Sequence, residues 1–194
     1  MARIHPAFAG TDAWLWSLTV AGAVTALFAS VMALRQTDLK QALAYTTLMA
    51  LGTLTLFLAD GSSSYAITGF MAFLVTHSLY KASLFLVVGL VDHGTGSRDA
   101  RILGGLARPM PVTAFAAALA GLSMAGLPPF VGFISKEILY KGAGEVTRQG
   151  FVPASALAAN ALMFAVAGIV CLRPFFGKKR GETPATPHEG PWQM

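Results

Sequence analysis

The sequence contains few charged residues and a single cysteine. Charged side chains make up only 12% of its 194 residues, about half of the ~25% that is typical of soluble domains. So few charges cannot coat a soluble globule of this size, whereas a lipid bilayer solvates an apolar exterior. Because Cys171 is the only cysteine, a disulfide scaffold and a cysteine-ligated zinc or iron–sulfur centre are excluded.

The sequence also lacks the motifs of nucleotide and cofactor chemistry. It has neither a phosphate-binding Walker loop nor a dinucleotide-binding fingerprint. We therefore expect no cofactor, no metal site and no enzyme active site, which leaves the movement of ions as the strongest functional class. The net charge of +5 is explained by basic loops of a membrane protein, so no nucleic-acid partner is expected.

Long apolar segments dominate what is present. Hydrophobic residues make up 55% of the chain and the mean hydropathy is +0.61. Each of five segments has about 20 residues or more, enough for a helix to cross a ~30 Å hydrocarbon core, and backbone groups in lipid must bond within their own helix. The segments are residues 13–34, 39–59, 65–91, 111–141 and 151–173. The sequence thus predicts an all-α, polytopic transmembrane helix bundle of about five spans, preceded by a polar N-terminal end at residues 1–12.

The fourth segment is interrupted by the Gly-Leu-Pro-Pro sequence at residues 126–129. Two prolines cannot continue an α-helix without losing hydrogen bonds, so this is either a turn between two spans or a break within one. A single broken span places nine of the 14 lysine and arginine residues on one side of the membrane and three on the other. That asymmetry fits the positive-inside rule. We therefore predict one span broken near Pro128 and Pro129, and a cytoplasmic, largely disordered tail at residues 174–194.

His77 and Lys81 lie four residues apart in the third segment, so they share one face of the predicted helix. A lysine at mid-bilayer costs roughly 2.5–3.5 kcal/mol and is normally tolerated only when it faces a bundle interior or water. Desolvation disfavours the charged form of a lysine, and histidine exchanges protons near neutral pH. The pair is interpreted as two stations of a proton relay. The structural alternative is a lysine that reaches the membrane surface and a histidine that bonds a neighbouring helix.

Lys136 and Glu137 follow the break. Interrupted helices expose free backbone groups and commonly form ion sites in transporters. A Lys–Glu pair there can remain charged or pass a proton between its members. The alternative is that both residues simply mark the membrane surface.

Charged residues at two segment ends have two interpretations each. Asp92 and His93 close the third segment, while Asp38 and Lys40 stand at the start of the second. Asp38, Asp92 and His93 are candidates for the point where protons enter the membrane, and Lys40 is a candidate relay station. All four could equally be polar helix ends.

Three ordered motifs resemble the proton-translocating antiporter-like family. They are residues 34–47, 76–86 and 126–137. This family includes the large subunit of the Mrp cation/proton antiporters and the membrane-arm subunits of respiratory complex I. Residues 172–177 and 187–192 look more like the Mrp protein than like complex I.

The resemblance implies that Lys81 and Lys136 lie on a central hydrophilic axis with His77 between helices, and that Lys40 is a further polar station. It also implies that this chain corresponds to the second of two inverted five-helix repeats. The expected function is part of a Na⁺/H⁺ antiporter in a bacterial plasma membrane, with other membrane subunits, H⁺ and Na⁺ as partners. The alternative is a proton-pumping subunit of an NADH–quinone oxidoreductase.

Overall fold

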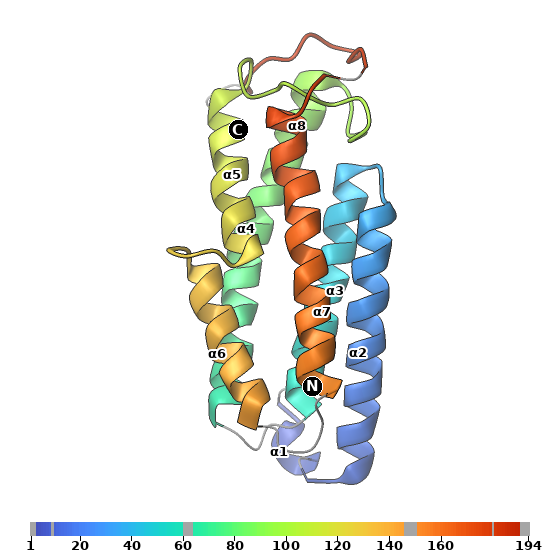
Figure 1. Ribbon diagram of the computed structural model, residues 1–194, viewed down its shortest axis with the longest axis vertical. Coiled ribbons are helices and arrows are strands. Elements are labelled where there is room, and N and C mark those ends of the chain that lie inside the picture. The colour runs from blue at the N-terminus through green and yellow to red at the C-terminus, as the bar shows by residue number, and fades with distance from the viewer. Residues whose placement is uncertain (1–2, 9, 60–63, 146–150, 180, 191–194) are drawn as a thin grey trace.

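The long helices of the chain run up and down a bundle in the computed structural model, and α5 and α6 follow one another in the same direction (Figure 1). The structure describes residues 3–8, 10–59, 64–145, 151–179 and 181–190. Their helices are α1 (His5–Phe8), α2 (Asp12–Arg35), α3 (Leu39–Ala59), α4 (Ser64–Thr95), α5 (Pro111–Ala125), α6 (Val131–Glu145), α7 (Phe151–Ala167), the π-helical turn η1 (Gly168–Leu172) and α8 (Arg173–Phe176). These residues contain no strand beyond an isolated bridge between Asp38 and Asp99, so the predicted all-α class is confirmed.

Four of the described helical segments are long and apolar enough to cross a membrane. They are Asp12–Arg35, Leu39–Ala59, Ile67–Thr95 and Ala154–Phe176. The helices α5 and α6 have 15 residues each, which is about 22 Å and less than a ~30 Å core. Because α6 continues downward from the point where α5 ends (Figure 1), the two together make one further crossing.

The break between α5 and α6 is formed by a glycine and two prolines. Gly126 ends α5 in the left-handed region at φ +80°, where glycine is favoured over residues with a Cβ. Its amide donates to the carbonyls of Leu122 and Ser123, both at 3.1 Å. Pro128 and Pro129 have no amide hydrogen to extend the helix. The prediction of a span broken at this place is therefore confirmed.

Two glycines allow α2 and α3 to pack backbone against backbone. A Cβ atom added at Gly22 would lie 2.7 Å from the amide nitrogen of Leu56, and one added at Gly52 would lie 2.6 Å from that of Ala26. Real Cβ atoms do not approach backbone this closely, so both positions require glycine. Small residues at such crossings are the usual means of close helix packing in membranes.

We predict that Gly52→Val lowers the yield of folded protein, because overpacking a close contact costs about 1–3 kcal/mol. The matched control is Gly89→Val on α4, since a Cβ at Gly89 has no neighbour within 4 Å. The amount of detergent-stable protein after mild heating is the measurement. Equal survival of the two variants would contradict the proposed role of the α2–α3 contact.

The loop between α4 and α5 is tied to the start of α3. The amide of Ala100 donates to the carbonyl of Thr37 at 2.8 Å. Within the loop, side-chain and backbone hydrogen bonds from Arg101 hold the pKa of Asp99 below its usual range. These contacts fix one end of the bundle, which is formed by the start of α3 and the loop between α4 and α5 and is called the polar end below. The tail also lies at this end.

The tail lies across this polar end (Figure 1). The amide of Ala185 donates to the carbonyl of Thr95 at 3.1 Å. The Glu189 carboxylate accepts hydrogen bonds from the amides of Val112 and Thr113, at 3.2 and 3.1 Å, at the start of α5. A carboxylate suits the free N–H groups and positive dipole of a helix N-terminus. Beyond α8, the described residues 177–179 and 181–190 form no helix but make these specific contacts. The predicted disorder of the tail stays a prediction. Arg180 and Trp192 lie outside the described residues.

Candidate functional site

Lys81 points into the bundle from α4. Its side chain is buried, with 6% of the residue exposed. The ammonium donates to the carbonyl oxygen of Leu43 at 2.6 Å and to the hydroxyl of Thr46, both on α3. The ring of Phe85 lies 5.7 Å from the ammonium nitrogen, within the range of a cation–π contact. The ammonium is thus held inside the bundle.

The contacts of Lys81 place its charge close to the polar end of α3. Leu43 is five residues after Asp38, which corresponds to about 7.5 Å along a helix. Lys81 lies near the middle of α4, as it does in the predicted segment, whereas its ammonium contacts α3 only four to seven residues after that helix begins at Leu39. The ammonium therefore lies about two turns below the start of α3.

His77 lies one turn before Lys81 and is also buried. Its ring is 6.1 Å from that of Phe73 and 5.3 Å from that of Tyr80. Among the described residues, neither Nδ1 of His77 nor the Tyr80 hydroxyl has a hydrogen-bond partner. Buried polar atoms without protein partners are commonly satisfied by water.

Lys136 occupies the break between α5 and α6. Only 6% of the residue is exposed. Its ammonium donates to the carbonyls of Met124 and Ala125 at 2.8 and 3.2 Å, which are backbone acceptors that the end of α5 leaves free. The negative end of the α5 dipole adds to this attraction.

Glu137 is not paired with Lys136. Successive helical residues point about 100° apart, and Glu137 instead forms an ion pair with Lys141 at 3.0 Å on the outer face of α6. Neither Lys81 nor Lys136 has a carboxylate partner in the part of the chain that the structure describes. Both ammonium groups are held by neutral oxygen atoms.

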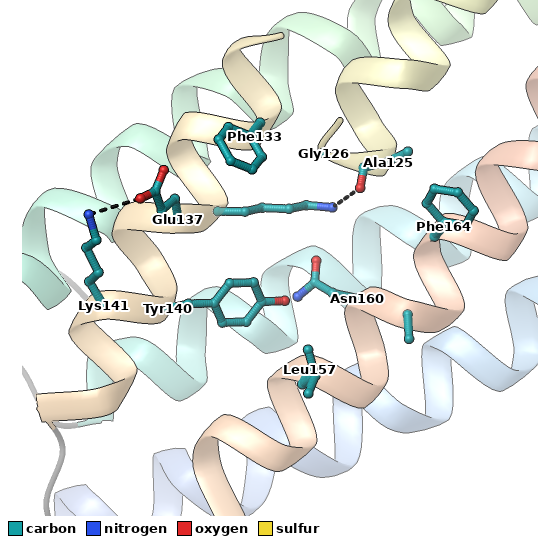
Figure 2. Close-up of a pocket in the computed structure, with 11 residues that line it drawn as sticks. Ala125, Gly126, Phe133, Glu137, Tyr140, Lys141, Leu157, Asn160 and Phe164 are labelled. Carbon is teal, nitrogen blue, oxygen red and sulfur yellow. Dashed lines mark hydrogen bonds and ion pairs between the residues drawn. The ribbon is translucent and has the colours of Figure 1, made fainter. Parts of the chain in front are cut away.

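A pocket of about 650 Å³ opens beside the break (Figure 2). It lies between the end of α5, the outer face of α6 and the facing side of α7. Polar groups of Lys136, Tyr140 and Asn160 line it, together with apolar side chains such as Phe133 and Phe164. Asn160 was not predicted as a site residue. Its signal is that it is the only asparagine of the sequence and stands inside an apolar segment.

The remaining predicted residues lie together at the polar end, apart from both lysines. Asp38 accepts the amides of Lys40 and Gln41 at 2.7 and 3.1 Å and thereby caps α3. Its other oxygen pairs with Arg98 at 3.3 Å, and Asp92 lies 3.8 Å from the same arginine.

Two further residues of this end are exposed. The Lys40 side chain faces outward at the start of α3. His93 lies with its ring centroid 6.2 Å from that of His188 in the tail. Within the described residues, no three His, Cys, Asp or Glu side chains form a group that could hold a metal ion.

Comparison with known proteins identifies the family. The profile described as "NADH:quinone oxidoreductase/Mrp antiporter, TM" matches residues 1–159. The chain belongs to this family. It is 40% identical over 200 residues to a probable K(+)/H(+) antiporter A/B subunit of Rhizobium meliloti, covering all of this chain and 20% of the relative. It is 39% identical over 218 residues to the A-type subunit of a Na(+)/H(+) antiporter of Alkalihalophilus pseudofirmus, covering 100% and 27%.

A solved structure agrees with these matches. The chain superimposes on one chain of the Mrp complex from Dietzia sp. with a TM-score of 0.83 at 36% identity, covering 90% of this chain and 20% of that chain. This member of the antiporter family thus spans about a fifth to a quarter of the length of these relatives.

Proposed function

We propose that this chain forms part of the proton path of a multisubunit monovalent cation/proton antiporter. The observation that carries the proposal is the burial of two lysine ammonium groups without carboxylate partners. Placing a lysine in the membrane costs roughly 2.5–3.5 kcal/mol on insertion scales. A lysine held only by neutral oxygen atoms can give up its proton without leaving an opposite charge unpaired, which suits a group that must cycle between two protonation states.

The proposed path runs along the bundle between its two ends. Protons enter at the polar end, where Asp38, Asp92 and His93 lie and where exposed Lys40 is an outer station. They pass to Lys81, then to His77 on the same face of α4, and reach Lys136 at the break through water. Unpartnered buried atoms at His77 and Tyr80 support bound water along this route.

Glu137 is the proposed station beyond Lys136, at the outer side of the pocket. Its carboxylate is accessible and paired with Lys141, so it can exchange protons with water. The charge state of these groups would drive a cation at a coupled site elsewhere in the complex. A membrane potential supplies about 2.3 kcal/mol per charge per 100 mV, which sets the scale of each charge movement.

The polar end with the tail is proposed to face the cytoplasm of a bacterial cell. Arg35, the loop between α4 and α5, and α8 all lie at this end (Figure 1), whereas Lys141 lies at the opposite end of the bundle. Lysine and arginine are therefore concentrated on one side, as the positive-inside rule expects of the cytoplasmic face. Arg148, counted on the opposite side, is outside the described residues. The partners proposed are the other membrane subunits, H⁺ and a monovalent cation.

Antiport is tested in everted membrane vesicles acidified by respiration, with a fluorescent dye that reports the internal pH. We expect added NaCl or KCl to raise the internal pH in vesicles that contain the complete complex, but not in vesicles from cells lacking this chain. Both cations are tested because relatives are named for each. An equal response in the two preparations would contradict the proposal. Proton uptake that depends on this chain and on an electron donor, but not on either cation, would favour the oxidoreductase alternative.

A further inference from the structure

Asn160 lines the pocket beside Lys136 and holds a buried hydrogen-bond acceptor without a partner among the described residues. Its side-chain amide nitrogen donates to the carbonyl of Ala156 at 2.9 Å, one turn earlier on α7. A carbonyl can only accept, so this bond fixes the nitrogen of the amide toward the helix and the oxygen away from it. The residue is 7% exposed, and among the described residues its oxygen has no partner. In Figure 2 that oxygen points to the side of the pocket on which Ala125 and Gly126 lie.

The Lys136 ammonium has a matching unused donor. An ammonium carries three N–H groups, and two of them are occupied by the carbonyls of Met124 and Ala125. Among the described residues, the further contact of the ammonium is the sulfur of Met163, at 3.9 Å, which is a weak acceptor. An unsatisfied donor and an unsatisfied acceptor therefore line the same pocket.

The two groups lie close to the same part of α7. Met163, which touches the ammonium, follows Asn160 by three residues on α7, a rise of about 4.5 Å. Asn160 and the residue that touches the ammonium are therefore about one helical turn apart. The Tyr140 hydroxyl points toward the Asn160 amide (Figure 2) and is a third polar group at the same place. Two to four polar partners are what a buried water requires.

We propose that Lys136 and Asn160 hold a water molecule between them, and that this water exchanges the proton of Lys136 with the pocket. Asn160 is thus a positioning residue: it acts on the proton through the water that it holds. The inference rests on the proposed function, because it specifies how one station of the path reaches solvent. When Lys136 gives up its proton, the water accepts it and passes a proton on toward the open side of the pocket, so that charge and atoms balance.

The test replaces Asn160 within the complete complex and measures exchange in everted vesicles. Asn160→Leu fills the position with an apolar group of similar size, which removes the acceptor and excludes the water. Asn160→Ser retains a hydroxyl and frees space for water. Ala158→Leu is the control, because Ala158 is exposed on another side of α7 and outside the pocket.

We expect Asn160→Leu to lower the maximal exchange rate about tenfold, a change equivalent to ~1.4 kcal/mol in the barrier. The cation concentration at half-maximal rate and the amount of assembled complex stay unchanged. Asn160→Ser retains most of the rate, and Ala158→Leu retains all of it. A merely structural role for Asn160 would lower the amount of complex, and the serine variant would not restore the rate.

The proposal is overturned if Asn160→Leu exchanges at the wild-type rate, or if Asn160→Ser is as slow as the leucine variant. It is also overturned if Asn160→Leu changes the half-saturating cation concentration alone, since that outcome assigns the pocket to the cation. A high-resolution map of the wild-type complex must show water within about 3.2 Å of both side chains. Lys81→Ala is measured in parallel. If that variant still exchanges, the proposed function is contradicted. If it does not exchange while Asn160→Leu exchanges at the wild-type rate, only the proposed water between Lys136 and Asn160 is contradicted.

Discussion

Replacing Lys81 with alanine is expected to abolish cation-driven proton exchange while leaving the complex assembled. The change removes the ammonium that Leu43 and Thr46 hold inside the bundle. A positioned group that transfers protons supplies about 10²–10⁴-fold in rate, so the residual rate should be at most about a hundredth of wild type. Internal pH after addition of NaCl or KCl to everted vesicles is the measurement.

The control for Lys81 is Lys178→Ala, which removes the same charge from an exposed position in the tail. It should exchange at the wild-type rate, because the deleted ammonium faces solvent and is not on the proposed path. A Lys81→Ala complex that exchanges as fast as this control would exclude Lys81 from the path. The amount of complex must be measured for both variants, since Lys81 also joins α3 to α4.

The helices of this protein could be predicted because lipid imposes a strong constraint on sequence. A span must be long and apolar, and Pro128 and Pro129 interrupt a helix because they cannot donate its backbone hydrogen bonds. The segments predicted at residues 39–59 and 111–141 accordingly match α3 and the α5–α6 pair closely. The helices continue four residues beyond two of the predicted ends, from Lys141 to Glu145 in α6 and from Val91 to Thr95 in α4. The last turn of α4 is polar and carries no hydropathy signal, although the Thr95 hydroxyl bonds back to the carbonyl of Val91 at 2.7 Å.

The residues of the candidate site were predictable, but most of their partners were not. His77, Lys81 and Lys136 stand out because titratable groups are rare in apolar segments. Their acceptors are mainly backbone carbonyls, which every residue possesses and which no sequence pattern distinguishes.

Glu137 shows the opposite case, in which a pattern was present but another interpretation was chosen. A glutamate four residues before a lysine favours an ion pair along a helix, and that is the pairing with Lys141 in the structure. The break suggested a pair with Lys136 instead. Asn160 was overlooked because one amide in an apolar helix has no motif, and its importance depends on which residue it faces.

Lys136→Met is expected to reduce exchange as severely as Lys81→Ala, for a different structural reason. Methionine has nearly the shape of lysine, so the side chain can still fill the break, but it donates nothing to the carbonyls of Met124 and Ala125. Leaving these acceptors unsatisfied destabilises the protein by about 1–3 kcal/mol. Removing the buried charge stabilises it, because the charge no longer has to be desolvated. We therefore expect near-normal assembly together with an exchange rate at least about a hundredfold lower.

Measuring exchange and assembly together separates the two roles of Lys136. Lys179→Met serves as the control, because Lys179 is exposed and the same substitution there removes a charge without changing the contacts at the break. If Lys136→Met assembles and exchanges at the control rate, the ammonium only closes the end of α5, and the proton path must bypass the break. If it assembles without exchanging, the cap on α5 is dispensable and the proton on Lys136 is not. The second result is expected, because a neutral donor would suffice to close the helix end, whereas this position holds an ammonium inside the membrane at considerable cost.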